Sequence, residues 1–483
     1  MPGNARDESE ARTRRERVDP RLKEQGWIVV PFDGKASSSH HTHHAVTEFP
    51  TANGPADYGL MVDGQPLGIV EAKRLSLGPQ NVLTQAERYS KGVDPSPFNF
   101  HGFRVPFLYS TNGEVVWFHD VRHRLNCSRQ LATFHTPSAL AELLDRDFEA
   151  ACGTLLAMPN AHPRLRPYQV EANAAIERAI HDRKRKMLVA MATGTGKTFT
   201  MVNQVYRVMK SGVGSRILFL VDRRALAAQA VRAFASFEPE PSKKFDKIYE
   251  VYSQRFQRAD LGDDAPFDPK VLPNAYLTNP KPKHAFVYVS TIQRMAVNLF
   301  GRQAVWSAEE DGIDEDAEQL KIPIHAFDVI IADECHRGYT TAEMSLWRNT
   351  LDHFDAIKIG LTATPAAHTK AYFRDVVFRY EYARAVREGY LVDYDVVTIK
   401  SNVRMDGVFL KEGETVEVVD PETGDDRLDQ LEDEREFVSA DVERTVTSPD
   451  SNRKLLEEVK RYAQEHEQRV DEGSRLERGQ IVG

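Results

Sequence analysis

The chain has 483 residues, of which 41% are hydrophobic and 28% are charged, and its formal net charge is −9. A chain of this length is expected to form two or three domains, and it contains no apolar run of the ~18 residues that a membrane-spanning helix needs. The polar, charged opening excludes a secretory signal, and three widely spaced cysteines argue against a disulfide framework or a cysteine metal site, so we expect a cytoplasmic protein.

The first elements are expected near the start of the chain. Residues 12–25 predict a helix that ends at Gly26, and the stretch WIVVPF that follows predicts a buried strand. The tract SSSHHTHH, residues 37–44, has a composition that can bind metal. It lacks an acidic or cysteine partner, so we expect it to be structural.

Residues 56–74, ADYGLMVDGQPLGIVEAKR, predict two strands joined by an Asp-Gly turn. Side chains two residues apart on a strand share a face, so Glu71 and Lys73 are expected to point to the same side. The turn brings Asp57, near the start of the first strand, close to Glu71. The apolar lead LGIV favours a partly buried site, because a buried charge without a partner is costly.

The oxygen atoms of this hairpin suit a magnesium ion. Two carboxylates, Asp57 and Glu71, and the carbonyl of Ala72 are hard ligands of the kind that Mg²⁺ takes. A bound Mg²⁺ activates water and clamps a phosphoryl oxygen, while Lys73 can neutralise charge on the phosphorus. The hairpin therefore predicts a phosphodiester-cutting site. The alternative is a weak cross-strand ion pair on a solvated hairpin.

The next stretch, NVLTQAERYSKGV, predicts a helix on which Gln85 and Tyr89 lie one turn apart on one face. Such a face can be a binding surface or an ordinary amphipathic helix, and the sequence does not separate these alternatives. The dipeptide Asn112-Gly113 then predicts a second hairpin. Together these elements predict a mixed α/β domain over residues 1–150, followed by a proline-punctuated linker over residues 151–163.

Beyond the linker, short apolar strands alternate with longer helical stretches, which predicts an α/β domain with a parallel sheet and helices on both faces. The expected strands are KMLVAM, RILFLV, AFVYVST, FDVIIAD and AIKIGLTAT. We expect this domain to cover residues 164–388. Residues 389–483 open with an acidic stretch that is expected to be a solvated excursion between this domain and the start of a second lobe.

The segment ATGTGKT lies between an expected strand and an expected helix, which is the context of a phosphate-binding loop. Glycines let backbone N–H groups approach phosphate, the lysine reaches the β and γ oxygens, and the following threonine offers a hydroxyl to Mg²⁺. Met191 stands where the strict pattern has glycine. We expect ATP and its Mg²⁺ to be held by Thr193, Gly194, Thr195, Gly196, Lys197 and Thr198.

The strand FDVIIADECH ends in two acids. Asp333 is placed to hold Mg²⁺ through its coordinated water, and Glu334 to orient and deprotonate the attacking water. With the phosphate-binding loop, this run resembles helicase superfamily 2, a resemblance that extends from Arg164 to about Arg387.

The same resemblance assigns further residues. LRPYQ is similar to the element that contacts adenine, which indicates Gln169 together with Arg166. The strand-end motifs that grip the DNA backbone indicate Arg223, Ser290, Thr291 and Gln293. GLTATP is similar to the motif that couples hydrolysis to movement, and indicates Thr362, Ala363 and Thr364.

The hairpin carries a second resemblance. Asp57, Glu71 and Lys73 resemble the PD-(D/E)xK nuclease motif, with the proline of that pattern displaced to Pro55. QAERY resembles a Gln-x-x-x-Tyr element that accompanies this nuclease, which implies a DNA or active-site contact for Gln85 and Tyr89. The first helix also resembles that of the family and would offer Glu10 as a further acid near the metal.

A nuclease of this type ahead of a superfamily 2 motor is the order found in the R subunit of type I restriction enzymes, which the chain resembles over about residues 8–400. In type III subunits the nuclease follows the motor. The resemblance implies an ATP-dependent translocase and Mg²⁺-dependent endonuclease that acts on double-stranded DNA with a methyltransferase and a specificity subunit. Two alternatives stay open: a DNA-binding or repair helicase whose N-terminal domain is not catalytic, and a catalytically idle partner subunit.

Residues 390–483 contain no Gln-x-x-Gly-Arg-x-x-Arg pattern. We therefore expect one complete RecA-like lobe, without the second lobe whose arginines reach the γ-phosphate. This predicts a chain that binds ATP but hydrolyses it slowly by itself. Such a chain is a fragment, or a second chain completes it.

Overall fold

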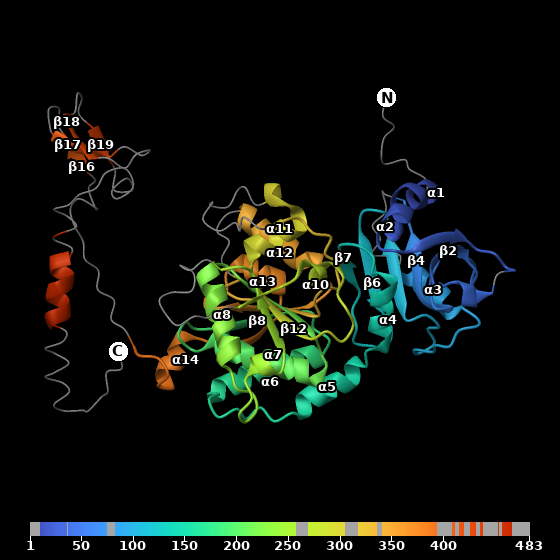
Figure 1. Cartoon of the computed structure of the whole chain (residues 1–483), viewed down its shortest axis with the longest axis horizontal. Helices are drawn as coiled ribbons and strands as arrows, with labels where there is room; N and C mark the ends of the chain where they lie inside the picture. Colours follow the sequence, from blue (N-terminus) through green and yellow to red (C-terminus); the bar gives the residue numbers. More distant parts are fainter. Residues whose placement is uncertain are drawn as a thin grey trace. The chain divides into compact units, whose positions relative to one another are not determined.

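The computed structural model describes two compact units of the chain, residues 1–392 and residues 393–483 (Figure 1). The described residues are 10–35, 37–74, 83–256, 269–304, 317–335, 341–393, 408–410, 415–419, 426–430, 435–437, 453 and 456–465. The first unit holds two separate sheets, one built from strands before residue 132 and one from strands after residue 185.

The first sheet has its strands in the order β1-β2-β3-β4-β5-β6-β7. Its pairs are antiparallel except β1 with β2 and β4 with β5, so it is a mixed sheet. The strands are β1 Ile28–Pro31, β2 His43–Phe49, β3 Ala56–Val62, β4 Gln65–Ala72, β5 Phe107–Thr111, β6 Val116–Asp120 and β7 Arg129–Leu131. The helical segments around it are α1 Glu10–Thr13, η2 Arg14–Val18, α2 Asp19–Glu24, η3 Ser38–His40, α3 Leu83–Lys91 and α4 Pro137–Asp145.

Both predicted hairpins are present. Asp63 and Gly64 have positive φ angles of 48° and 80°, as a two-residue turn between twisted strands requires, and they join β3 to β4. At the second hairpin Gly113 has a φ of 88°, and the side chain of Asn112 accepts hydrogen bonds from the N–H groups of Glu114 and Val115. The Asp-Gly and Asn-Gly predictions are therefore confirmed.

Two predictions about the start of the chain need correction. The expected buried strand, β1, lies at the edge of the sheet, and Ile28 is 52% exposed because the strand pairs only with β2. The expected helix over residues 12–25 is interrupted by one turn of π-helix, Arg14–Val18. It ends as predicted, with Gly26 at a φ of 86°.

The second sheet has the strand order β11-β10-β12-β9-β13-β14-β8-β15, and every pair in it is parallel. The five predicted strands are present as β8 Lys186–Met191, β9 Arg216–Val221, β12 Phe286–Thr291, β13 Val329–Ala332 and β14 Ile357–Thr362. The sequence reading missed β10 Glu250–Ser253, β11 Lys270–Val271 and β15 Val376–Tyr380.

Helices cover both faces of this sheet, as its apolar strands predict. One face packs on α5 Phe148–Ala157, α6 Pro167–His181, α7 Lys197–Ser211 and α8 Arg224–Ser236. The opposite face packs on α10 Asn274–Thr278, α11 Ile292–Phe300, α12 Thr341–His353 and α13 Ala367–Phe373, and the remaining helical segments are η5 Phe245–Lys247, η6 Arg302–Ala304 and α14 Tyr382–Arg387.

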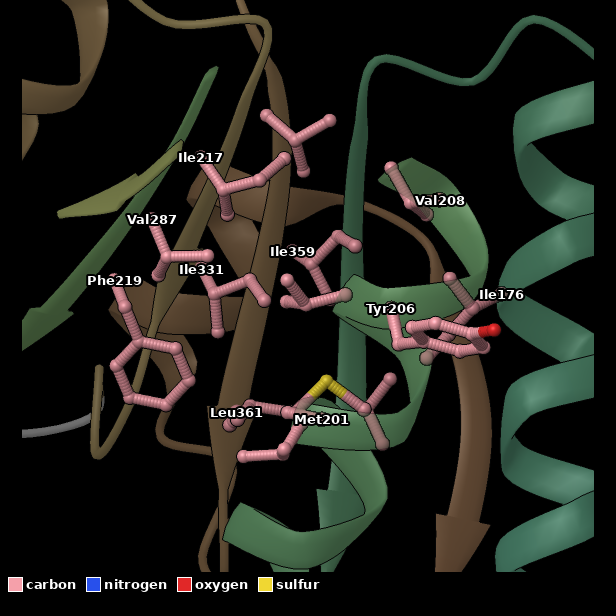
Figure 2. Packing of buried hydrophobic residues seen from close by; sticks show 14 of the residues in the cluster. Ile176, Met201, Tyr206, Val208, Ile217, Phe219, Val287, Ile331, Ile359 and Leu361 are labelled. Atoms are coloured by element: carbon pink, nitrogen blue, oxygen red, sulfur yellow. The ribbon is translucent and has the colours of Figure 1, made fainter. Parts of the chain in front are cut away.

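Side chains of neighbouring residues on one strand belong to different hydrophobic cores, one on each face of the sheet. On β9, Ile217 and Phe219 belong to the first core, while Leu218 belongs to the second. Figure 2 shows the first core, in which Ile217, Phe219, Ile331 and Ile359 from the strands face Met201 and Tyr206 of α7. A sheet buried on both faces has no polar alternation, which is why its strands are continuous apolar runs.

The expected linker over residues 151–163 differs in the structure. Most of it belongs to α5, and Ala151, Cys152 and Leu155 are buried in the first core beside α6 and α7. Asp147 caps this helix by accepting from the N–H of Ala150. The apolar side chains recur with helical spacing, so packing, and not the proline-rich stretch that follows, decides the structure of this segment.

Residues 393–483 are described only in short pieces. β16 Val408–Leu410 pairs with β19 Arg435–Phe437, and β17 Thr415–Val419 pairs with β18 Asp426–Gln430, both antiparallel. The expected acidic excursion and the start of a second lobe fall largely outside the described residues. Among the helices that the structure describes, none combines the length and hydropathy needed to cross a membrane.

Candidate functional site

The first candidate site lies where strands β3 and β4 part. Asp57 Oδ2 accepts a hydrogen bond from the backbone N–H of Ala72 at 2.7 Å, which ties the carboxylate to the far strand. Glu71 is only 4% exposed, and its Oε1 accepts from Lys73 Nζ at 2.8 Å. The structure thus brings together the three side chains that the sequence singled out, and it uses the N–H of Ala72, a group that the sequence reading did not consider.

Burial governs the protonation of this site. Burial raises the pKa of Asp57, against the lowering effects of the Ala72 N–H and the Arg14 charge. Burial and the charge of Asp57 raise the pKa of Glu71 as well. For Lys73, burial would lower the pKa, but the hydrogen bond and charge of Glu71 outweigh it and the pKa is raised. Lys73 therefore stays protonated at neutral pH.

One oxygen of Glu71 shows that the site suits a cation. Oε2 is buried and has no hydrogen-bond partner among the residues that the structure describes. A buried, unsatisfied carboxylate oxygen is costly, and a metal ion is a chemically suitable partner for it. No cluster of three or more histidine, cysteine or acidic ligands occurs in the described part of the chain. Mg²⁺ needs few protein ligands, because it keeps several of its waters.

Two side chains of the N-terminal helical segment reach the same site. Arg14 Nη1 lies 2.9 Å from Asp57 Oδ1, and Glu10 Oε1 lies 3.7 Å from Lys73 Nζ. Glu10, expected as an extra acid near the metal, is thus close to the site through Lys73. The sequence reading missed Arg14, whose only local signal is its position one turn after Glu10.

The Gln-x-x-x-Tyr element lies on α3. Tyr89 is 9% exposed and packs with Ile69 and Leu108 in the core under the sheet, while Gln85 is half-buried. Packing explains the position of the Tyr89 ring by itself. A DNA or active-site contact for these two residues stays a prediction.

The second candidate site is the loop between β8 and α7. Gly194 and Gly196 have φ angles of 81° and 77°, in the left-handed region that glycine adopts without strain. Thr193 is exposed and Thr198 is half-buried in the first turn of α7. Thr195 is buried and donates its hydroxyl proton to the carbonyl of Ala192 at 2.6 Å, so it shapes the loop.

Gln169 supports this loop from behind. Its Nε2 donates to the carbonyls of Thr195 and Gly196 at 3.1 and 3.3 Å, and its Oε1 accepts from the Arg166 N–H at 2.9 Å. The Arg166 guanidinium stacks over the ring of Tyr390 at 5.0 Å. Gln169 is thus buried and fully engaged with the loop, and the adenine contacts of both residues stay predictions.

The two acids after β13 face the loop. Lys197 Nζ lies 3.4 Å from Glu334 Oε1, which joins the two predicted ATP motifs. Burial and the neighbouring charge of Glu334 raise the pKa of Asp333 to about 6. Glu334 has a φ of 50°, a conformation rare for a residue with a side chain and often found at functional sites. His336, the next polar residue in the motif, lies outside the described residues.

The predicted DNA contacts fall into different environments. Arg223 is exposed and Gln293 is half-buried. Ser290 and Thr291 are buried, and the Thr291 hydroxyl caps α11 by accepting from the N–H of Arg294. These two side chains therefore have structural roles in the described fold, and contact with DNA stays a prediction.

Sequence reasoning missed Gln254, which organises this strand end. Gln254 Oε1 accepts from the Thr291 N–H at 2.8 Å and from the Thr291 hydroxyl at 3.1 Å. It follows β10, a strand that the sequence did not predict. In the third motif, Thr362 is buried and accepts from the N–H of Thr364 at 3.0 Å, while Ala363 is half-buried.

Both candidate sites lie in segments that match known protein families. Residues 30–144 match the family described as "Type I restriction enzyme EcoKI endonuclease subunit second domain", and residues 162–367 match "Type III restriction enzyme, res subunit". The chain is 32% identical over 510 residues to the type I restriction enzyme EcoKI endonuclease subunit of Escherichia coli K12, covering 92% of this chain and 40% of the relative.

One further curated relative and one solved structure are also similar to this chain. The EcoAI endonuclease subunit of Escherichia coli is 29% identical over 404 residues, covering 79% of this chain and 41% of the relative. A fragment structure described as an HsdR subunit of a type I restriction enzyme from Vibrio vulnificus YJ016 is 22% identical, covers 79% of this chain and 61% of that chain, and has a TM-score of 0.30. The chain spans about 40% of the length of the two curated relatives. It belongs to the family of type I restriction enzyme endonuclease subunits.

Proposed function

We propose that this chain carries the DNA-cutting site and an ATP-binding motor lobe of a type I restriction enzyme, and that it acts on double-stranded DNA. The observation that supports cutting most directly is the buried Oε2 of Glu71 beside Asp57 and Lys73, which has no hydrogen-bond partner within the described part of the chain. We assign residues 1–150 to a PD-(D/E)xK nuclease domain and residues 164–388 to the first RecA-like lobe.

In the nuclease domain, Asp57 and Glu71 would hold Mg²⁺. When bound, Mg²⁺ supplies a coordinated water of lowered pKa and a clamp on a phosphoryl oxygen. Lys73 presents a positive charge to the phosphodiester, since its pKa is raised and Glu71 fixes its ammonium group. The proposed contacts are to the DNA backbone rather than to base edges. Such contacts carry no sequence information, so target choice would belong to a specificity subunit.

In the motor lobe, the described residues fit a nucleoside triphosphate. The two glycines of the loop have the left-handed conformation that turns N–H groups toward phosphate, and Lys197 follows them at the start of α7. Thr198 and Asp333 would hold the Mg²⁺ of the nucleotide, and Glu334 would orient the attacking water. Hydrolysis of ATP bound at this site would supply the free energy for movement along DNA.

The family membership also suggests the surroundings of the chain. We propose that it assembles with methyltransferase and specificity subunits and acts in the cytoplasm, where these subunits and the DNA are. Gln85 and Tyr89 would contribute near the nuclease site, as the sequence predicts.

The test uses the chain assembled with both subunits and a plasmid that carries the target site. Glu71→Gln and Lys73→Met are expected to abolish Mg²⁺-dependent cleavage while ATP binding is retained, and Lys197→Ala to abolish ATP binding. Glu87→Gln, a carboxylate of the same domain outside the site, is the matched control and should cleave normally. Cleavage by Glu71→Gln at the parent rate would refute the proposed nuclease site.

A further inference from the structure

Glu48, an acid with a strained backbone, lies opposite Asp57 on the neighbouring strand. The pairs Thr47 with Tyr58 and Phe49 with Ala56 place Glu48 opposite Asp57 between strands β2 and β3. Glu48 has a φ of 52°, in the left-handed region that a residue with a side chain rarely adopts. Such strain persists only where the surrounding structure holds it, and it gathers at functional sites.

Arg14 bridges these two acids. Its Nη1 lies 2.6 Å from Glu48 Oε1 and 2.9 Å from Asp57 Oδ1, so one nitrogen serves both carboxylates. The Arg14 and Asp57 side chains are only 24% and 20% exposed, whereas Glu48 is 57% exposed. Arg14 begins the single turn of π-helix, a distortion that is frequent at functional sites.

The charges of the site leave room for one divalent cation. Among the residues that the structure describes, ion pairs link four carboxylates to two cations here, which leaves a surplus of two negative charges. The carboxylates are Glu10, Glu48, Asp57 and Glu71, and the cations are Arg14 and Lys73. A metal on Asp57 and Glu71 would balance that surplus. It would also meet the guanidinium of Arg14 at Asp57 Oδ1, and two cations at one oxygen repel.

We propose that Arg14 is a latch on the metal site: its guanidinium competes with the divalent ion for Asp57, and Glu48 is the acceptor to which it withdraws when the ion binds. Because Nη1 already contacts both acids, release of Asp57 needs no new partner. The N-terminal helical segment then governs the metal affinity, since Glu10 of the same segment also contacts Lys73. This inference rests on the proposed function, in which Asp57 is a metal ligand.

The test measures Mn²⁺ binding to the full 483-residue chain by isothermal titration calorimetry, without DNA. Nucleotide is left out, because the motor site holds its ion largely through phosphate oxygens. Arg14→Gln is expected to tighten Mn²⁺ binding by about tenfold, since it removes a positive charge from a ligand of the ion. Arg12→Gln removes a charge from the same segment, where it pairs with the exposed Glu16, and should bind Mn²⁺ as the parent does.

Glu48 gives an effect of opposite sign. Glu48→Gln is expected to weaken Mn²⁺ binding several-fold. Of the two acids that Arg14 contacts, only Asp57 then keeps its charge, so Arg14 holds Asp57 more strongly against the ion. Glu48 is more than half exposed, so this variant does not endanger the fold. The double variant Arg14→Gln/Glu48→Gln should match Arg14→Gln alone, since Glu48 acts through Arg14.

Three results would decide against the latch. Unchanged or weaker Mn²⁺ binding in Arg14→Gln, with the parent's thermal unfolding, means that Arg14 only positions Asp57. A double variant that binds more weakly than Arg14→Gln means that Glu48 ligates the ion itself. Asp57→Asn and Glu71→Gln test the metal site of the proposed function separately from the latch. If both variants bind Mn²⁺ like the parent, that metal site fails, and the latch fails with it.

Discussion

Arg129, on the last strand of the first sheet, makes a two-point ion pair with Asp355, which precedes β14 of the second sheet. Nε lies 2.6 Å from Oδ1 and Nη2 lies 2.8 Å from Oδ2. Arg185 and His135 bind the same carboxylate at 2.7 and 3.0 Å. Burial would raise the pKa of Asp355, but Arg129 and Arg185 hold it well below its ordinary value. One buried acid thus ties the first sheet to the second sheet.

Replacing this acid should loosen the join between the two sheets. Asp355→Ala leaves Arg129 and Arg185 without their buried counter-ion, and breaking such a pair costs about 3–5 kcal/mol. We expect a lower free energy of unfolding and two separate transitions in calorimetry, one for each sheet. Asp352→Asn is the control, because Asp352 is 46% exposed in its pair with Lys186 and should cost less than about 1 kcal/mol. A single, unshifted transition in Asp355→Ala would contradict the prediction.

Asp333 should affect the pH dependence of stability in the opposite sense to Asp355, because its pKa is raised whereas that of Asp355 is lowered. Its folded-state pKa is raised to about 6, so the folded chain loses stability as pH rises from the unfolded pKa of about 4 to about 6, and the loss is constant above that. Asp333→Asn removes this cost and is expected to stabilise the nucleotide-free chain at pH 7.5 by roughly 1–3 kcal/mol.

The measurement is urea unfolding of both chains at pH 4.5 and pH 7.5. The gain from Asp333→Asn should shrink at the lower pH, where the parent's carboxyl is already protonated when folded. An equal gain at both pH values would show that packing, and not ionisation, is responsible. The same substitution should weaken Mg²⁺-dependent nucleotide binding, as expected where a site residue is retained at a cost in stability.

The sequence predicted the parts of the fold whose physics is local. The five central strands are continuous apolar runs because both of their faces are buried, and the Asp63-Gly64 turn fixes which side Glu71 and Lys73 share. Strand β15 was missed because its apolar run is only three residues long, VVF, and ends at the exposed Arg379. Helix α5 was missed because a proline-rich stretch follows it, although its apolar residues have helical spacing.

The site residues that sequence reasoning missed all act through distant contacts. Arg14 reaches Asp57 over a separation of 43 residues, and Gln254 reaches Thr291 over 37. Nothing near Arg14 or Gln254 in the sequence indicates which partner the docked elements will offer. The motif residues Asp57, Glu71 and Lys73 could be placed because they lie on one hairpin, where period and turn type determine proximity.

The phosphate-binding loop offers a test of close packing. A Cβ on Gly196 would lie 2.7 Å from Gln169 Nε2, and the φ of 77° already disfavours any side chain there. Gly196→Ala is therefore expected to weaken ATP binding by more than about tenfold, through backbone strain and displacement of Gln169. Binding of a fluorescent ATP analogue measures it.

A matched control comes from helix α5. A Cβ added at Gly153 would meet no atom within 4 Å beyond its chain neighbours and the backbone of its own helix. Gly153→Ala should therefore stabilise the chain by about 0.5–1 kcal/mol and leave ATP binding unchanged. The double variant Gly196→Ala/Gln169→Ala separates the two effects of the loop substitution. It removes the clash and keeps the strain, so an ATP affinity equal to that of Gln169→Ala alone would show that strain contributes little.

Magnesium should stabilise the chain through Glu71. A ligand that binds only the folded state adds about 1.4 kcal/mol when its concentration is tenfold above its dissociation constant. Without nucleotide, Mg²⁺ is expected to raise the melting temperature of the parent, and EDTA to reverse the shift. In Glu71→Gln the shift should vanish, because the buried Oε2 no longer offers a negative charge to the ion.

The metal-free chains give the complementary result. Burial and Asp57 raise the pKa of Glu71, so its ionised form is less favourable in the folded chain than in the unfolded chain. Glu71→Gln in EDTA should therefore melt at or above the parent temperature, while Lys73→Met, which leaves Glu71 charged and without its lysine partner, should melt below it. If Glu71→Gln melted lower than the parent without metal, Glu71 would be a structural ion-pair partner of Lys73, and the case for a metal ligand at this position would fail.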